Sequence, residues 1–450
     1  MIVDAGLLVV ANLLFLAAGA GVTALAGWWQ GLRGLGGSLG VSYLVGVAAY
    51  GVVAQVLYVV GAPLSRVEVV AVCGILALGT LRGLRLPSGL SPKVPPVWVL
   101  LAPALFLALL ALDLWYQPLW SFDSWTFWTP SAYGLFTLDG LDTSWFTSAE
   151  MLGGARRDYP LLLPAVEAAG FRFMGYEPRL LDLQSWIFLV GFVVAIVQVT
   201  AARARSIVLG AVLLMLVVAP ATAAQLANAE ADIPLAILFA AAGMCAVLWL
   251  ESRESRALVL ATVLACGAAA TKIEGPIFVG AMFAALTACA WRGSRRDSLK
   301  ALGAFAVVIA LGVAPWRIWV HAHGGAPTGA APSLSPSTLL DQVSYIPQAA
   351  AYLAVKLLDP LGWLLIVPLW AVATWVAWRK GQRLPVAFAV ATIGIAFAGL
   401  VISYWSTPID LHHHLATSAR RVVTSIVFLC AALTPLFAGS EPRLDSETIR

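Results

Sequence analysis

The chain has 450 residues, of which 61% are hydrophobic and only 11% are charged, and its mean hydropathy is +0.89. A soluble protein of this length carries about 25% charged residues, so this composition excludes a soluble globular protein. The net charge is only +4, and without a soluble domain the chain has no basic surface for a nucleic acid. We therefore expect no nucleic-acid partner.

Apolar runs of the length that spans a bilayer follow one another along the whole chain. They predict an all-α polytopic membrane protein with about 13 transmembrane helices, forming a single integral membrane domain over residues 1–450. The predicted spans, of which 67–81, 257–271 and 276–291 are the shortest, are 3–27, 39–61, 67–81, 97–116, 182–202, 206–222, 233–250, 257–271, 276–291, 299–319, 361–378, 385–405 and 421–438.

Lysine and arginine gather in alternate loops, and the positive-inside rule makes those loops cytoplasmic. The N-terminus is then outside and the C-terminus inside. Two long loops, 117–181 and 320–360, fall on the outer face together with most of the acids and all five histidines. Because functional residues concentrate in varied polar loops, we expect an extracytoplasmic active face. The alanine-, glycine- and arginine-rich composition is typical of a high-GC bacterium, so the expected location is its inner or plasma membrane.

The stretch SFDSWTFWTPSAYGLF, residues 121–136, places Asp123 among aromatic side chains at the edge of an apolar run. A carboxylate that is partly desolvated beside Trp125 and Trp128 would be a better general base. The alternative is that Asp123 caps the helix expected to begin near Ser124.

Further along, RRDYPLLLP, residues 156–164, offers Arg157 for a phosphate, and Asp158 and Tyr159 for a sugar or acceptor. Asp158 could instead cap a helix that begins around Pro160, with proline at its first position. The arginines could equally be solvated loop charges.

Two outward turns carry charged pairs. Glu230 and Asp232 in NAEADIPL could hold a divalent cation, the only cofactor that the residues suggest, or could favour a helix N-terminus. In TKIEGP, Lys272 and Glu274 could form a salt bridge across the turn, and Lys272 could also neutralise a lipid phosphate.

The segment STPIDLHHHLATSARRVV, residues 406–423, places His413 and Ser418 near one face of a helix, with Arg420 and Arg421 just beyond. These arginines stand where the last span enters the membrane, at a natural height for a lipid phosphate. They could also be snorkelling anchors.

In this order, the motifs resemble those of the GT-C superfamily of membrane glycosyltransferases, and most closely its bacterial members related to protein mannosyltransferases and aminoarabinose transferases. The resemblance covers residues 97–425. It is carried by FDSWTFWTPSAYGLFTLDG, RRDYPLLLP, EADIPLA, TKIEG and TPIDLHHHLATSARR.

The resemblance implies a GT-C-like bundle with a helical first outer loop, and transfer of a sugar from a polyprenyl-phosphate donor to a lipid, glycan or protein acceptor. Asp123 takes the family's catalytic position. Donor phosphate would meet Lys272, Arg157, Arg420 and Arg421. Ile273 replaces the asparagine of the family's turn, and the resemblance names no particular sugar. A membrane transporter, a lipid flippase and a non-catalytic envelope partner are the alternatives.

Overall fold

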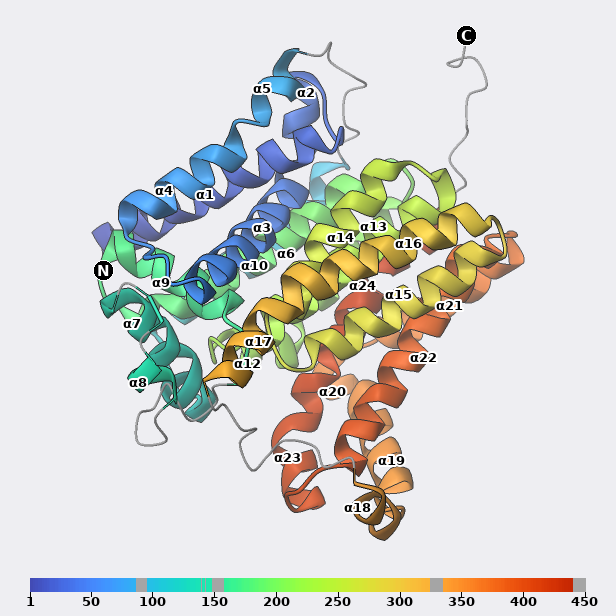
Figure 1. Ribbon diagram of the computed structural model, residues 1–450. Helices are drawn as coiled ribbons and strands as arrows, with labels where there is room; N and C mark the ends of the chain where they lie inside the picture. Colours follow the sequence, from blue (N-terminus) through green and yellow to red (C-terminus); the bar gives the residue numbers. More distant parts are fainter. Residues whose placement is uncertain (86–94, 139, 142, 148–157, 324–334, 440–450) are drawn as a thin grey trace.

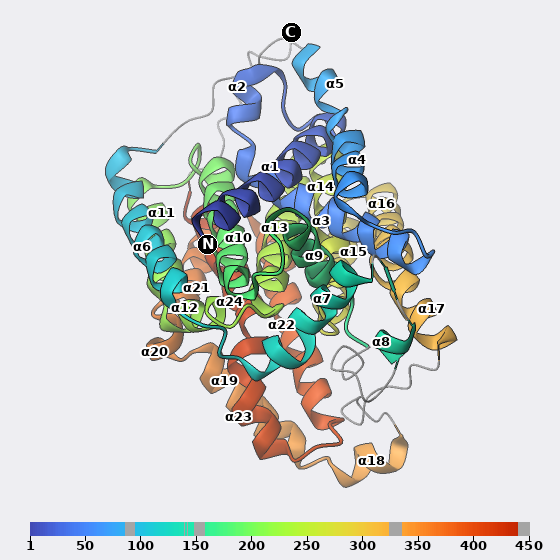
Figure 2. The same cartoon turned by 90° about the vertical axis from the view of Figure 1, so that its left-hand side faces the viewer.

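The computed structural model describes residues 1–85, 95–138, 140–141, 143–147, 158–323 and 335–439. Over these ranges the chain is helical and contains no β-strand. Its long helices form a bundle in which α2 (Gly31–Gly36) and α5 (Thr80–Arg85) lie near one end, and α18 (Pro336–Asp341) and α23 (Leu411–Val422) near the other (Figures 1 and 2).

Nine helical segments of the described chain are long and apolar enough to cross a membrane, or up to eleven when each of two bent helix pairs counts as one span. The chain is therefore an integral membrane protein of the all-α class. The nine segments are Ile2–Leu25 (α1), Leu39–Val59 (α3), Arg66–Leu84 (containing α4, Arg66–Ala77), Val97–Tyr116 (α6), Pro178–Thr200 (containing α10, Leu181–Thr200), Asp232–Ser252 (α13), Arg295–Ala322 (α16, Arg295–Val308, and α17, Ala314–Ala322), Arg383–Trp405 (α22) and Leu411–Ala438 (α23, and α24, Thr424–Ala438).

The predicted count of 13 spans is not confirmed. The runs at 257–271 and 276–291 form α14 (Ser255–Ala269) and α15 (Gly275–Trp291), which have only 15 and 17 residues. A membrane span needs about 20 residues, and the turn before Pro276 ends α14 early.

Two other runs are broken. α11 (Ser206–Val218) and α12 (Pro220–Leu226) meet at 50°, because Pro220 cannot continue the helix. The segment Tyr345–Trp363, with α19 (Tyr345–Leu357) and α20 (Pro360–Trp363), meets α21 (Ile366–Arg379) at 104°. The second pair is a broken span or a re-entrant loop.

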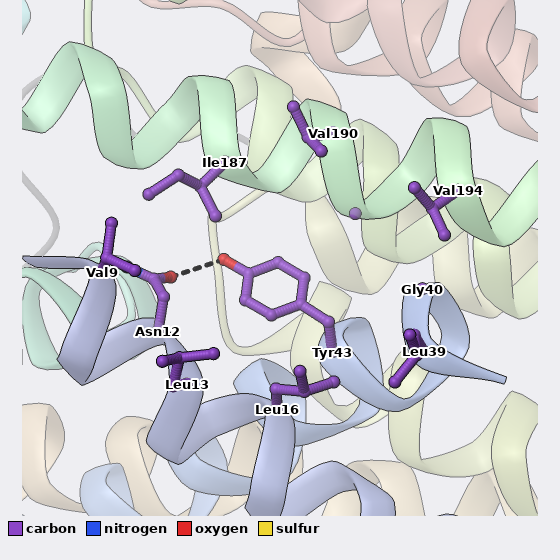
Figure 3. Close-up of a pocket in the computed structure, with 11 residues that line it drawn as sticks. Val9, Asn12, Leu13, Leu16, Leu39, Gly40, Tyr43, Ile187, Val190 and Val194 are labelled. Atoms are coloured by element: carbon purple, nitrogen blue, oxygen red, sulfur yellow. Dashed lines mark hydrogen bonds between the residues drawn. The ribbon is translucent and has the colours of Figure 1, made fainter. Parts of the chain in front are cut away.

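Close packing of α1 against α3 depends on glycine. A Cβ added at Gly19 would lie 1.7 Å from the Ser42 carbonyl oxygen, and small residues of this kind let helices approach closely within membranes. The Tyr43 hydroxyl of α3 donates a 2.7 Å hydrogen bond to Asn12 of α1 (Figure 3). Gln184 of α10 exchanges hydrogen bonds with the same asparagine. Three helices are thereby held in register.

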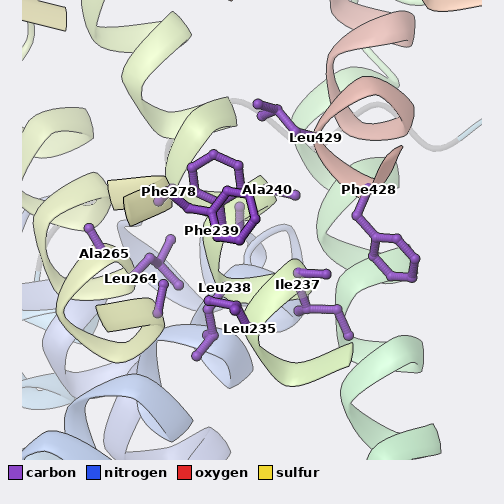
Figure 4. Packing of buried hydrophobic residues seen from close by; sticks show 14 of the residues in the cluster. Leu235, Ile237, Leu238, Phe239, Ala240, Leu264, Ala265, Phe278, Phe428 and Leu429 are labelled. Atoms are coloured by element: carbon purple, nitrogen blue, oxygen red, sulfur yellow. The ribbon is translucent and has the colours of Figure 1, made fainter. Parts of the chain in front are cut away.

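Helix α13 forms the centre of the bundle and packs against α14 and α24. Phe239 of α13 lies beside Phe278 of α15, with ring centroids 5.3 Å apart, while Leu429 of α24 closes the other side (Figure 4). Because side chains on every face of α13 are buried, this helix fixes the position of Asp232 at its first turn.

The 117–181 loop, expected on the outer face, contains helices, as the resemblance implied. They are the π-helical turn η1 (Ser124–Trp128), α7 (Thr129–Thr137), α8 (Thr143–Thr147) and α9 (Leu162–Met174). Helix α9 corresponds to the helix expected to begin around Pro160. It begins at Leu162 instead, and it is buried against α1 and α3.

Candidate active site at one end of the bundle

A polar cavity of about 700 Å³ lies at the α23 end of the bundle. Its wall is built by the segment just before η1, the loop before α9, the turn between α14 and α15, α17, the end of α22, and α23. Helices α17 and α23 lie in the lower half of Figures 1 and 2. Six of the residues predicted from sequence line it, namely Asp123, Asp158, Tyr159, Lys272, His413 and Arg421. Segments spread over 300 residues of chain therefore meet at one place, as expected.

Asp123 contacts a cation across this cavity. Its Oδ2 lies 2.6 Å from Nη1 of Arg421. Asp123 precedes η1 but makes no capping hydrogen bond there, so the structure does not favour the capping interpretation. The contact that the structure records for this carboxylate is with a guanidinium and not with an indole ring.

Arg421 also contacts the two acids of the NAEADIPL turn. Its Nη2 lies 3.0 Å from Glu230 Oε2, and its Nε lies 3.2 Å from Asp232 Oδ2. One planar guanidinium thus faces three carboxylates, an arrangement that suits the fixed donor fork of arginine. The Ser121 hydroxyl donates to Glu230 and the Ser124 hydroxyl donates to the Asn228 carbonyl, which ties the segment before η1 to the same turn.

Lys272 completes the group. Its ammonium lies 2.7 Å from Asp232 Oδ1 and 3.4 Å from Glu274 Oε1, so the predicted salt bridge within the TKIEGP turn is confirmed. Burial alone would lower the pKa of Lys272, but the two carboxylates outweigh it and raise this pKa above its usual value. Lys272 therefore stays charged although it is buried.

We call these side chains the Arg421 cluster. Two cations face four carboxylates, so the fully ionised cluster has a formal charge of −2. Burial raises the pKa of Glu230 to about 7, with Arg421 opposing the shift and Asp232 adding to it. Glu230 is thus the member that takes up a proton near neutral pH. The cluster consists of Arg421, Lys272, Asp123, Glu230, Asp232 and Glu274.

Asp158 lines the cavity from the loop before α9 and is only 8% exposed. It does not cap a helix, since Leu161 stands at the N-cap of α9, and its Oδ1 has no hydrogen-bond partner among the described residues. Beside it, the Tyr159 ring stacks on Phe127 at 6.4 Å and meets Trp128 edge-on at 5.1 Å. Asp158 and an aromatic wall around Tyr159 therefore lie together at this part of the cavity.

Helix α23 presents part of its polar face to the cavity. Asp410 caps the first turn of this helix by accepting a 2.8 Å hydrogen bond from the His413 backbone N–H. His413, His414 and Ser418 line the wall. The side chain of His414 is held by Thr407 at 2.9 Å. The predicted common face of His413 and Ser418 is confirmed.

Five predicted site residues lie elsewhere among the described residues. Trp125 is largely exposed and donates its indole N–H to the Leu119 carbonyl, whereas Trp128 is buried behind Tyr159. Arg420, one position before Arg421, faces a different cavity and pairs with Asp359 at 3.1 Å. Glu230 and Asp232 are not among the residues that line the cavity. They contact Arg421 and Lys272, which do line it. The predicted Arg157 lies outside the described residues.

The metal hypothesis fits this arrangement poorly. Glu230 and Asp232 already face Arg421 and Lys272, which stand where a divalent cation would need to be. Among the described residues, no group of three or more histidine, cysteine or acidic side chains is placed to hold a metal ion.

Arg317 of α17 is a cavity residue that the sequence interpretation missed. It is exposed, and no ion pair of the described part of the chain involves it. The sequence did contain a signal for Arg317, because an arginine inside an apolar run is energetically costly unless it faces a partner or a water-filled cavity. Arg317 falls within the predicted span 299–319.

A second hollow, of about 350 Å³, lies between α1, α3 and α10 (Figure 3). Its lining is apolar apart from Asn12 and Tyr43, and it contains no charged side chain. It offers no acid or base for chemistry, so the polar cavity remains the candidate active site.

Comparison of the chain with protein-family models, with curated proteins and with solved structures finds no match.

Proposed function

We propose that the protein is a glycosyltransferase that moves a sugar from a polyprenyl-phosphate donor to an envelope acceptor on the outer face of the membrane. The observation that carries this proposal is the polar cavity itself. It brings together Asp123, Asp158, Lys272 and Arg421, which come from four of the five motifs that resemble GT-C enzymes.

Asp123 is the proposed base. The acceptor hydroxyl oxygen forms the new bond to the anomeric carbon, and its proton passes to the Asp123 carboxylate. The bond between the anomeric carbon and the phosphate oxygen breaks, and its electron pair leaves with the polyprenyl phosphate. Displacement from the opposite face inverts the anomeric configuration. The leaving group is already an anion, so no strong general acid is needed.

Arg421 positions this base. Its contact at 2.6 Å fixes the direction of the Asp123 carboxylate, and pre-positioned groups lower the entropic part of the barrier.

Donor phosphate needs cationic partners in the cavity. Lys272 and Arg421 are largely neutralised by the acids of their own cluster, so we assign the first phosphate contact to Arg317. This arginine lines the same cavity and stands on a different helix. A planar guanidinium matches phosphate bidentately.

The Arg421 cluster contains more carboxylates than cations, and this excess suits a sugar ligand. An ionised carboxylate accepts hydrogen bonds from hydroxyl groups, and Asp158 has an unpartnered oxygen, among the described residues, beside the Tyr159 ring. We assign sugar recognition to this pair together with His413.

A transporter or lipid flippase is supported less well. Translocation needs polar groups near the midplane, whereas the centre of the bundle around α13 is packed with Phe239, Phe278 and Leu429 (Figure 4). The ionisable cluster lies at one end of that helix.

The test is transfer of radiolabelled sugar from polyprenyl-phosphate donors to membrane lipids and glycans. Asp123→Asn should abolish transfer with unchanged membrane insertion. The matched control is Asp341→Asn, an exposed acid of α18 outside the cavity, which should keep full activity. Undiminished transfer by Asp123→Asn would remove Asp123 from the mechanism. Movement of substrate across liposomes without a covalent product would favour the transporter.

A further inference from the structure

A second polar cavity, of about 330 Å³, lies on the other side of α23. It is bounded by α12, by the end of α19 and by α23, whose Thr417 and Arg421 line both cavities. Helix α23 therefore separates the proposed active site from a neighbouring hollow to which the proposed function gives no role.

The lining of this second cavity is positive. Lys356 and Arg420 contribute two cations, and the lining includes no acidic side chain. Arg421 also lines this cavity, but its charge is largely neutralised by the acids of its own cluster. Arg420 is half exposed and has one carboxylate contact, to Asp359 at 3.1 Å. The Lys356 ammonium lies 5.2 Å from the centre of the Tyr352 ring. The polar cavity, by contrast, is lined by both cations and acids.

The same wall contains a buried amide. Gln225 of α12 is only 5% exposed, and its Oε1 accepts a 3.0 Å hydrogen bond from the Thr424 hydroxyl. Its Nε2 has no hydrogen-bond partner among the described residues. A buried donor without a partner is unfavourable, and a ligand that accepts hydrogen bonds in this cavity would satisfy it once the amide turns toward the cavity.

We propose that this second cavity binds a phosphate group. The wall offers an amide N–H, an ammonium and a guanidinium and no carboxylate, which is the donor set that phosphate oxygens accept and that repels a cation. The proposal does not depend on the transferase reaction, since neither Lys356 nor Gln225 lines the active-site cavity.

The surroundings favour a lipid headgroup as the source of this phosphate. Val355, Leu358 and Leu361, which flank Lys356 in the chain, are between 56% and 82% exposed. Exposed apolar side chains next to a cation are typical of a membrane interface, where acyl chains meet the former and the headgroup meets the latter.

The experiment uses the purified full chain in neutral detergent at constant ionic strength. The midpoint of thermal unfolding is followed while phosphatidylglycerol, diacylglycerol or inorganic phosphate is added. Phosphatidylglycerol should raise the midpoint and diacylglycerol, which lacks phosphate, should not. A rise with inorganic phosphate as well would show that the site takes free phosphate too.

Three variants test whether the rise in the unfolding midpoint comes from binding in this cavity. Lys356→Gln, which loses only its contact with the Tyr352 ring, should weaken the response to phosphatidylglycerol about tenfold, as expected for one charge-assisted contact. Gln225→Leu should weaken it without removing charge. The matched control Arg383→Gln removes an exposed cation from the far end of α22 and should respond like the native chain.

A response to either phosphate probe that depends on Lys356 and Gln225 supports the proposal. A response that is equal in the native chain, Lys356→Gln and Gln225→Leu overturns it, and so does the lack of any response to both probes. Each variant is first checked for the native elution volume and the native unfolding midpoint without probe, so that a folding defect is not scored as lost binding.

Discussion

Arg421 lies 2.6 Å from Asp123 although 298 positions of sequence separate them, and the same guanidinium faces Glu230 and Asp232. This one side chain joins the segment before η1, the turn before α13 and the start of α13 to α23. The position of the candidate base therefore depends on a residue at the far end of the chain.

Removal of Arg421 should destabilise the protein. Arg421→Gln leaves three carboxylates facing one another, and breaking a largely buried ion pair by removing one partner costs about 3–5 kcal/mol. The free energy of unfolding, measured by denaturant titration in detergent, should fall by about that amount. Arg420→Gln is the control, because Arg420 is 51% exposed and has one pair, so its loss should cost about 1 kcal/mol or less. If the two variants lost the same free energy of unfolding, the ion pairs of Arg421 would not stabilise the protein as proposed.

Removal of Lys272, which contacts the other carboxylate oxygen of Asp232, should also destabilise the protein. Lys272→Met fills a similar volume but removes the charge 2.7 Å from Asp232, and should cost about 3–5 kcal/mol. Lys300→Met is matched to it, because Lys300 pairs with Asp297 at 2.9 Å and its side chain is 37% exposed, against 3% for Lys272. Its loss should cost about 1 kcal/mol or less. If Lys272→Met proved as mild as Lys300→Met, the salt bridge would be dispensable.

Glu230 should make stability depend on pH. Burial raises its pKa from the ordinary 4.5 to about 7, so between these values the folded chain binds a proton that the unfolded chain has released. The contribution of Glu230 is then fully present below about pH 4.5 and is lost as the pH rises through about 7. Unfolding midpoints of the native chain should fall across this window more steeply than those of Glu230→Gln. Parallel profiles would rule out Glu230 as the titrating group.

Arg317→Gln tests the proposed phosphate contact in the active-site cavity. The side chain is exposed and has no ion pair within the described part of the chain, so stability should change by about 0.5 kcal/mol or less. The KM for the polyprenyl-phosphate donor should rise at least about tenfold, because a charge-assisted contact is lost. Arg296→Gln, an exposed arginine near the start of α16, is the control and should leave KM unchanged. A lower kcat at constant KM would place Arg317 in another role.

The sequence by itself determined that the chain is an all-α membrane protein, because bilayer-length apolar runs leave little choice of structure. It also located Asp123, Asp158, Lys272 and Arg421, because an ionisable residue at the edge of an apolar run is costly and stands out. A helix limit was harder to predict at Pro220, which divides the predicted span 206–222 into two helices that meet at 50°.

Only the tertiary structure decided which of these charges meet. Arg420 and Arg421 are neighbours in sequence, yet successive helical residues point about 100° apart. Both line the smaller cavity, but of the two Arg421 alone also lines the larger one. Arg317 joins the active-site cavity because α17 packs beside it, which no local pattern encodes. Ion pairs across hundreds of residues are fixed by how helices pack, and packing depends on the whole chain at once.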